Sequence, residues 1–143
     1  MTALVFLDYE AVVEIHEDEL AVSGGLAGIR DDNALRSAIA APEHLFAYED
    51  ADVVQLAGAY LVHLAMNHAF VDGNKRTGYI ACLTFLRLNG IDLGAPPSLE
   101  IATLAVASKL IDRAAATGIL RQLVILATDD PSYYAKVHAT RPA

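Results

Sequence analysis

The sequence predicts an all-α fold, and three of its features support that prediction. Apolar residues recur at helical intervals through most of the 143 residues, and no stretch shows the strict alternation of a strand. Hydrophobic residues make up 55% of the chain, and many are alanines, which favour closely packed helices. Glycine and proline gather between the periodic segments, where helices end. A chain of this length folds as one domain around one core.

Six helices are expected, each with an apolar face. The first places Val12, Ile15 and Leu20 at helical intervals and gathers its acidic residues on the opposite face. The second is expected to stop before Pro42, because proline disfavours the helical conformation of the residue before it. The expected helices span residues 8–21, 33–41, 52–67, 74–88, 98–110 and 112–126.

Residues that cap helices stand at several of the expected starts. The candidate caps are Asp31 or Asp32 for the second helix, Ser98 for the fifth and Asp112 for the sixth. Residues 43–52 are expected to form a connecting loop or a short hairpin. The chain becomes polar near its end, so we expect a domain of residues 1–128 followed by a loose tail of residues 129–143, whose tyrosines Tyr133 and Tyr134 are candidates for docking.

Charge and hydrophobicity argue against several classes of protein. The net charge is −8, whereas a nucleic-acid-binding domain normally carries a basic face, so direct binding of DNA or RNA is disfavoured. The apolar run of residues 56–66 is too short to span a bilayer, and residues 1–10 lack the cationic start of a signal peptide. Cys82, the single cysteine, is expected to be buried as a small apolar residue. We therefore expect a cytoplasmic protein without membrane contact.

The stretch NHAFVDGNKRTG, residues 67–78, places polar groups between the two longest expected helices. Asn74 begins the second of these helices. A helix N-terminus presents unpaired N–H groups and a partial positive charge, and both attract anions. Gly73 lets the chain turn tightly and lets a phosphate approach the backbone. The stretch is therefore predicted to bind the phosphates of a nucleotide.

Lys75 and Arg76 stand where the helix disfavours cations. In the first helical turn they oppose the macrodipole, at a cost of about a few tenths of a kcal/mol each. A bound polyanion reverses the sign, because charge-assisted hydrogen bonds to phosphate are worth about 1.5–3 kcal/mol each. A solvated cationic pair is the alternative interpretation.

Asp72 and His68 add an anion and a titratable ring beside this helix start. Magnesium prefers one or two carboxylates together with phosphate oxygens, so Asp72 alone suffices as its protein ligand; the alternative role for Asp72 is an N-cap. Histidine titrates near neutral pH, which suits His68 to remove a proton from a hydroxyl; a structural role is the alternative. Phe70 is expected to anchor the loop in the core.

Other phosphate- and metal-binding motifs do not fit. The P-loop pattern G-x-x-x-x-G-K-[ST] is absent, and the glycines of residues 24–28 follow no strand, as a dinucleotide fingerprint requires. His63 and His68 lie five residues apart, which does not place two zinc ligands on one helix face. The other histidines are expected to be structural, and they are His16, His44, His63 and His138.

The string H-x-F-x-D-G-N-K-R-T of residues 68–77 resembles the active-site loop of the Fic/Doc family, and of its Doc (death on curing) toxin branch in particular. Similarity continues upstream over residues 15–42 and downstream into FLRLNG, and covers about residues 7–123. The resemblance implies a compact six-helix bundle with its active-site loop between two central helices. It also implies transfer of a phosphate-containing group from a nucleotide to a hydroxyl of a target protein.

The resemblance assigns a role to each polar residue of the loop. His68 becomes the general base that acts on the target hydroxyl, and Asp72 becomes the magnesium ligand. The implied phosphate-binding residues are Gly73, Asn74, Lys75 and Arg76.

The loop departs from that of Fic enzymes that transfer AMP, which is H-P-F-x-[DE]-G-N-G-R-x-x-R. Lys75 stands at the second glycine and Tyr79 at the second arginine. The Doc branch has the lysine, and the resemblance therefore implies transfer of the γ-phosphate. Ala69 replaces a frequent proline and Gly78 a usual alanine, and neither change removes a chemical group.

The favoured function is a toxin kinase that uses ATP, or another nucleoside triphosphate, with Mg²⁺. The resemblance implies elongation factor Tu as its target, whose modification blocks protein synthesis. A protein adenylyltransferase and a non-catalytic interaction module of the same fold are the alternatives. Lys75 and Tyr79 argue against the first, and the retention of every chemical group in the loop argues against the second.

Regulation is expected from a separate antitoxin. Many Fic-type proteins carry an inhibitory helix of the form [S/T]-x-x-x-E-[G/N], whereas no Ser or Thr in this chain stands four residues before a Glu. The resemblance implies a Phd-like antitoxin, whose disordered C-terminal segment folds onto an apolar groove of the toxin.

Overall fold

The computed structural model of the chain describes residues 3–128, which contain six helices and no strand. The expected tail of residues 129–143, with Tyr133 and Tyr134, lies outside the described residues. The predicted all-α, six-helix architecture is confirmed. No helix in the described part of the chain is long and apolar enough to cross a membrane. The helices are α1 (Tyr9–Ser23), α2 (Asp32–Glu49), α3 (Val53–Met66), α4 (Asn74–Leu88), α5 (Pro97–Ala107) and α6 (Arg113–Thr128).

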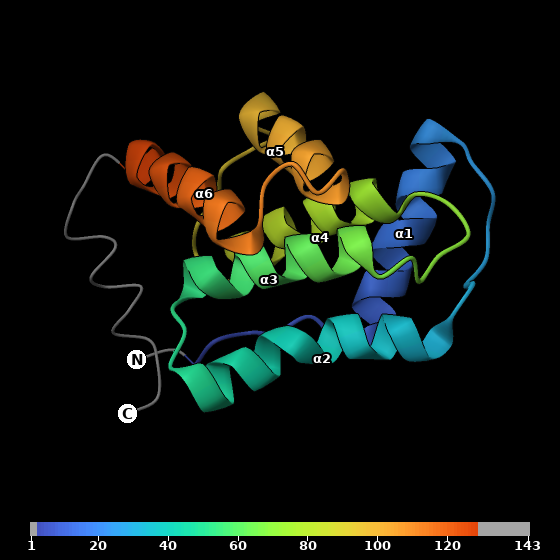
Figure 1. The fold of residues 1–143 in the computed structure, drawn as a ribbon, viewed down its shortest axis with the longest axis horizontal. Helices are drawn as coiled ribbons and strands as arrows, with labels where there is room; N and C mark the ends of the chain where they lie inside the picture. The colour runs from blue at the N-terminus through green and yellow to red at the C-terminus, as the bar shows by residue number, and fades with distance from the viewer. Residues whose placement is uncertain (1–2, 129–143) are drawn as a thin grey trace.

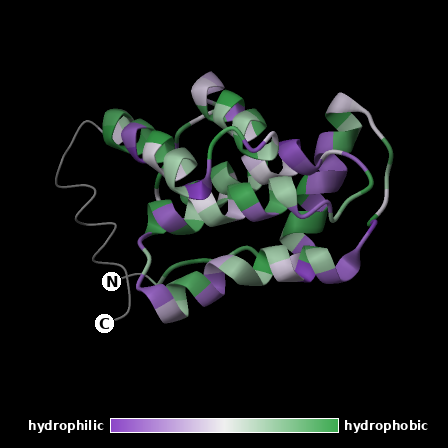
Figure 2. Cartoon of the chain, viewed as in Figure 1, coloured by the Kyte–Doolittle hydropathy of each residue, from purple (hydrophilic) through white to green (hydrophobic). Residues whose placement is uncertain are grey.

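Helices α3 and α4 form the centre of the molecule, where they lie side by side and run in opposite directions (Figure 1). Helices α2 and α6 pack against α3, α5 packs against both central helices, and α1 packs against α4 and α2. The loop that joins α3 to α4 contains the polar stretch identified from the sequence. Hydrophilic residues gather at the start of α4 and at both ends of α2 (Figure 2).

Gly78 allows the close packing of the two central helices. A Cβ atom at this position would lie 2.7 Å from the carbonyl oxygen of Leu61 and 3.0 Å from the amide nitrogen of Ala65, both in the backbone of α3. Rigid backbone atoms cannot move aside as a flexible side chain would. The distance between α3 and α4, and with it the geometry of their connecting loop, therefore depends on this glycine.

We expect Gly78→Ala to lower the free energy of unfolding by about 1–3 kcal/mol, because overpacking must push the central helices apart. Urea denaturation measures the change. Gly118→Ala is the matched control: Gly118 lies in α6 with nothing within 4 Å of its would-be Cβ, so alanine should stabilise the helix by about 0.5–1 kcal/mol. A gain in stability from Gly78→Ala would contradict the packing argument.

The prediction that the second helix stops before Pro42 is wrong, as is the loop or hairpin expected after it. Helix α2 continues to Glu49 with Pro42 buried inside it. Beyond the proline, Leu45 and Phe46 pack against the core, and the Phe46 ring lies 5.7 Å from that of Phe6. A proline inside a helix costs about 3 kcal/mol. Leu45 and Phe46 are partly buried, so each contributes a part of the about 1.5–3 kcal/mol that full burial would give, and together they help to offset that cost.

The other helix ends depend on residues near them in the sequence. The Asp31 and Asp112 carboxylates accept hydrogen bonds from the main chain three residues on, so both predicted caps are confirmed. Ser98 does not cap α5, which begins one residue earlier at Pro97 and has no side-chain cap. Helix α5 also ends earlier than expected, because Lys109 adopts a φ of +61° and turns the chain away.

The core fills the space between the helices. Tyr60 and Phe85 are fully buried at its centre, with their rings 5.0 Å apart. The Tyr60 hydroxyl accepts a hydrogen bond of 2.9 Å from the Leu7 amide and thereby ties down the segment before α1. Cys82 is buried, as predicted, and burial raises the pKa of its thiol.

Candidate active site

The loop between α3 and α4 begins at His68, whose backbone is strained. His68 has a φ of +52°, a conformation that is uncommon for residues other than glycine and that occurs often at functional sites. Its carbonyl oxygen accepts a hydrogen bond of 2.8 Å from the Arg30 side chain, which holds the strained turn. The His68 side chain is exposed. The predicted general base is therefore accessible to a macromolecule in solvent.

The chain between α1 and α2 supports the outer edge of this loop. The Arg30 amide donates to the Ala69 carbonyl at 2.8 Å, and the Val71 amide donates to the Gly28 carbonyl at 3.0 Å. These two bonds pair the segments side by side, as in an antiparallel bridge. Backbone far from the loop in sequence thus fixes the path of residues 69–71.

His16 of α1 contacts the loop through Phe70 and Asp72. It lies on α1, is only 4% exposed, and stacks on Phe70 with the ring centroids 3.7 Å apart and the planes 8° apart. Its Nε2 lies 2.8 Å from the carbonyl oxygen of Asp72, so the ring donates a hydrogen bond there. Sequence reasoning gave His16 no contact with the loop. Its spacing of four residues from the buried Val12 was the available signal that it faces inward.

Asn74 closes the loop on itself. Its side-chain oxygen accepts a bond of 3.0 Å from the Phe70 amide, and its side-chain nitrogen donates one of 2.9 Å to the Phe70 carbonyl. Phe70 itself is buried, as predicted. The Asn74 side chain is therefore engaged by the protein, and what Asn74 offers to an anion is its main-chain N–H at the start of α4.

Asp72 does not cap α4, so its alternative role as an N-cap is wrong. Residue 73, a glycine with a φ of +79°, takes the N-cap position and makes no side-chain capping bond. The Asp72 carboxylate instead accepts bonds from the amides of Gly73, at 3.0 Å, and Leu26, at 3.2 Å. A Cβ at Gly25 would lie only 2.9 Å from this carboxylate, so Gly25 keeps room for it.

The Asp72 carboxylate fits a magnesium ion that is shared with a nucleotide. It is exposed, and each oxygen accepts one hydrogen bond and so keeps a further lone pair. Within residues 3–128 no group of three or more His, Cys, Asp or Glu side chains is arranged to hold a metal ion. Any such ion here requires phosphate oxygens as further ligands, which is how magnesium usually binds beside nucleotides.

The start of α4 opens into a cavity of about 240 Å³ between α1, α4 and α5. Gly73, Lys75 and Arg76 line it, and no side chain caps the N–H groups of the first turn. Lys75 is exposed and forms no ion pair with a residue in the described range. Free N–H groups, a positive helix end and an unpaired ammonium all favour a phosphate in this cavity.

Arg76, in contrast, is held by two carboxylates. Its Nε lies 2.8 Å from Glu19 of α1 and its Nη1 lies 2.6 Å from Glu100 of α5. Ser23 donates a hydrogen bond to Glu19 as well. Partial burial opposes ionisation of Glu19, but the bonds from Ser23 and Arg76 outweigh it and lower the pKa of that carboxyl. An incoming phosphate must therefore compete with two anions for Arg76.

Comparison with known proteins agrees with this arrangement. A sequence profile of the Fic/DOC family matches residues 6–86, which is more than half of the chain. The chain belongs to the Fic/Doc family. It is 32% identical over 115 residues to a protein of Escherichia phage P1 named Protein kinase doc, covering 80% of this chain and 91% of that protein. It is 45% identical over 74 residues to a protein of Mycolicibacterium smegmatis named Toxin Doc, covering 50% of this chain and 57% of that protein.

These relatives support the Doc toxin branch. Within this Fic/Doc chain, Tyr79 of α4 holds the position of the second arginine of AMP-transferring Fic enzymes. Tyr79 lines the same cavity as Arg76, is 4% exposed, and donates a hydrogen bond of 3.3 Å to the Pro96 carbonyl. Burial raises the pKa of its hydroxyl. The position of the second Fic arginine therefore holds a neutral, anchored ring.

The structure brings all the predicted site residues of this Fic/Doc chain into one loop and one helical turn. They are His68, Asp72, Gly73, Asn74, Lys75 and Arg76. Sequence reasoning missed the residues that contact this loop and turn from α1, α5 and the α1–α2 connection. Those residues are His16, Glu19, Gly25, Arg30 and Glu100.

Proposed function

We propose that this protein is the toxin of a toxin–antitoxin pair and acts as a protein kinase. It transfers the γ-phosphate of ATP, or of another nucleoside triphosphate, to a hydroxyl of a translation factor in the cytoplasm, and elongation factor Tu is the expected target. The observation that supports this best is the exposed His68 six residues before Asn74, the uncapped start of α4, together with Lys75, which forms no ion pair within the described residues. The name of the phage P1 relative, a protein kinase, supports the same chemistry.

The donor nucleotide binds with its phosphates in the cavity at the start of α4. The main-chain N–H groups of Asn74 and Lys75 receive phosphate oxygens, and the Lys75 ammonium reaches the terminal phosphate. Asp72 would hold the magnesium ion together with these oxygens. Bound there, magnesium supplies neutralisation of the charge that develops on the phosphates.

The acceptor hydroxyl approaches His68. The imidazole takes the hydroxyl proton, and the oxygen forms a bond to the γ-phosphorus while the bond from that phosphorus to the β–γ bridging oxygen breaks. The products are the phosphorylated target and the nucleoside diphosphate. Arg30 bonds to the main-chain oxygen of His68 and leaves its exposed ring available for this proton transfer.

Lys75 and Tyr79 favour γ-phosphate transfer over AMP transfer. A lysine occupies the space where adenylyl transfer needs a small residue for the backbone to wrap the inner phosphates, and it adds a point charge suited to a terminal phosphate. In parallel reactions with α-labelled and γ-labelled ATP on elongation factor Tu, we expect label only from the γ position. The product should gain the mass of one phosphate, as read by mass spectrometry.

A different labelling pattern would reject transfer of the γ-phosphate. Label from the α position, with an AMP-sized mass gain, would identify an adenylyltransferase. His68→Ala protein in the same reactions gives the background for both labels, because it lacks the proposed base and keeps the phosphate-binding residues.

The partner that restrains the toxin is proposed to be a Phd-like antitoxin whose C-terminal segment folds on binding. A groove of about 400 Å³ between α1 and α4 supports this proposal. Val22 is 84% exposed and Leu88 is 51% exposed at the groove, so large apolar side chains face solvent there. An amphipathic helix covers such a surface with its apolar face.

A further inference from the structure

A second groove reaches His68 from the side of α3 and the α5–α6 turn. It begins as a hollow of about 460 Å³ that contains His68 and Lys109 in its lining. Lys109 and Met66 also line a neighbouring hollow of about 380 Å³, which extends to Arg113. Arg113 in turn lines a cavity of about 630 Å³ between α2, α3 and α6. We call this continuous surface the α3–α6 groove; Met66 and Leu110 are among its apolar members, and Lys109 and Arg113 are among its cations.

Three cations line the α3–α6 groove, and the one found only in its largest cavity, Arg121, is paired with Asp52. Neither Lys109 nor Arg113 forms an ion pair with any residue between positions 3 and 128. Burial and the nearby Arg113 lower the pKa of His63, which also lines the groove, and so favour its uncharged form. No acidic residue lines the hollow next to His68. In a protein with a net charge of −8, this is a local positive surface.

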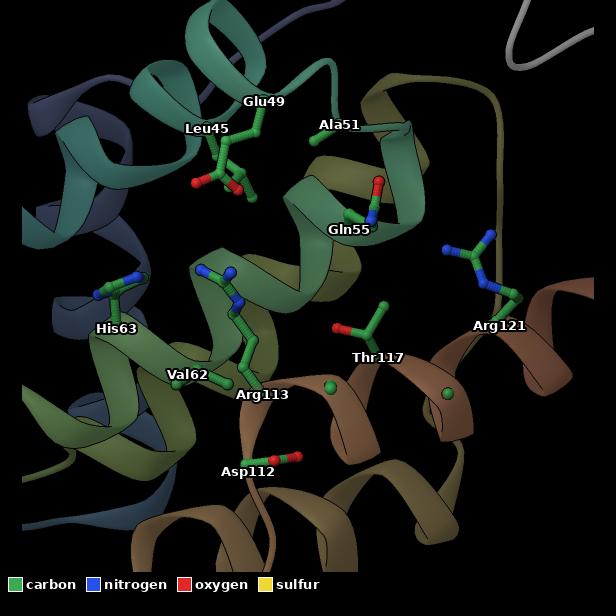
Figure 3. A pocket seen from close by; sticks show the side chains of 12 residues that line it. Leu45, Glu49, Ala51, Gln55, Val62, His63, Asp112, Arg113, Thr117 and Arg121 are labelled. Atoms are coloured by element: carbon green, nitrogen blue, oxygen red, sulfur yellow. The ribbon is translucent and has the colours of Figure 1, made fainter.

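Acidic residues enter the groove only farther from His68. Asp112 lines its middle, where its carboxylate caps α6 by accepting a bond of 2.8 Å from the Ala115 amide. Glu49 lies in the widest part, at the end of α2. Figure 3 shows the Arg113 side chain extending from the start of α6 into that part, which His63 also lines. The His68 end of the groove therefore contains a cation and no carboxylate.

Neither Lys109 nor Arg113 is the residue type that its local backbone position favours. Lys109 sits just past the end of α5 with a φ of +61°, where the bonds Lys109 N–Val106 O and Leu110 N–Ala105 O close a helix stop that favours glycine. Arg113 is the first residue of α6, where a cation opposes the helix dipole and an acid would support it. Residues that break local rules in this way commonly serve a functional site.

We propose that the α3–α6 groove binds an acidic segment of the target protein and leads its hydroxyl to His68. This inference rests on the proposed function, because the segment belongs to the protein that is phosphorylated. Charge complementarity with Lys109 and Arg113 selects the acidic residues, and Met66 and Leu110 offer apolar contact. The nucleotide phosphates occupy a different cavity, so both substrates can be present at once.

Steady-state transfer of phosphate from ATP to purified elongation factor Tu tests this proposal. We expect Lys109→Glu and Arg113→Glu each to raise the KM for the target about threefold, and the double variant about tenfold, with kcat and the KM for ATP unchanged. Arg87→Glu is the matched control, since it makes the same charge change at an exposed arginine that forms no ion pair within the described residues; Arg87 lines the α1–α4 groove proposed for the antitoxin, which is absent from this assay. It should leave every constant unchanged.

Measuring the stability of the groove variants shows whether a higher KM for the target comes from weaker docking or from a damaged fold. Lys109→Gly should raise the melting temperature, because glycine adopts this backbone conformation without strain, and should nevertheless raise the KM for the target. Arg113→Glu should likewise not destabilise α6, because an acid suits a helix start. A merely structural lysine or arginine would not give this combination.

Three results would overturn the inference. They are an unchanged KM for the target in all groove variants, an equal rise in the Arg87→Glu control, and a rise in the KM for ATP instead. Equilibrium binding of elongation factor Tu to His68→Ala protein, with and without Lys109→Glu, separates docking from chemistry. If Lys109→Glu weakens this binding but the wild-type protein transfers no phosphate, the groove proposal stands and the proposed kinase function is rejected. If elongation factor Tu does not bind at all, both proposals are rejected.

Discussion

Replacing His68 with alanine is expected to abolish phosphoryl transfer and growth arrest while leaving the fold intact. Loss of a general base costs about 10²–10⁴-fold in rate. The side chain is exposed, and the bond from Arg30 goes to the main-chain oxygen of His68, so the loop keeps its support. Transfer from γ-labelled ATP, growth after induced expression and thermal melting by circular dichroism measure the three expectations.

Two further variants make the His68 result specific. His44→Ala changes an exposed histidine of α2 and should remain fully toxic. His68→Asn should be as inactive as the alanine variant and at least as stable, because asparagine tolerates a positive φ. Growth arrest at the wild-type level by His68→Ala would remove the general base from the mechanism.

Replacing His16 with phenylalanine is expected to reduce both stability and activity. The new ring can still stack on Phe70, but the Asp72 carbonyl loses its donor, at a cost of about 1–3 kcal/mol. That carbonyl belongs to the residue proposed to hold magnesium. Loss of a group that orients a metal ligand typically lowers activity about 10–100-fold, so we expect a loss in that range and a need for more Mg²⁺.

His16→Gln separates positioning from packing. The glutamine amide can donate to the Asp72 carbonyl but cannot stack as an imidazole does, so activity and Mg²⁺ dependence should recover more than stability. Titration of the transfer rate with Mg²⁺, alongside urea denaturation, gives both quantities. If His16→Phe protein kept the wild-type rate and Mg²⁺ dependence, the loop would not need the bond from α1.

The parts of the fold that were predictable are those set by neighbouring residues. The caps Asp31 and Asp112 act on amides three residues away, and the start of α4 at Asn74 follows directly from Gly73. The candidate site was predictable for the same reason, because all its named residues lie within one stretch of residues 68–76. A contiguous motif needs no knowledge of which helices meet in space.

The parts that were not predictable depend on contacts between distant segments. Pro42 stays helical because residues beyond it pack on the core, a contribution that local propensity does not include. Glu19 lies 57 residues from Arg76 and Glu100 lies 24 residues from it. Spacing within a helix shows which residues share a face, but not which loop that face will meet. The second layer around the site therefore appears only in the structure.

The two carboxylates on Arg76 would make the proposed nucleotide binding an exchange of anions. A phosphate that takes Arg76 must release Glu19 and Glu100, so the measured affinity is a difference between two sets of ion pairs. Glu19 lines the cavity proposed for the phosphates and also the groove between α1 and α4. One side chain is thus common to both surfaces, and any ligand that moves it at one surface changes the free energy of binding at the other by the same amount in both directions.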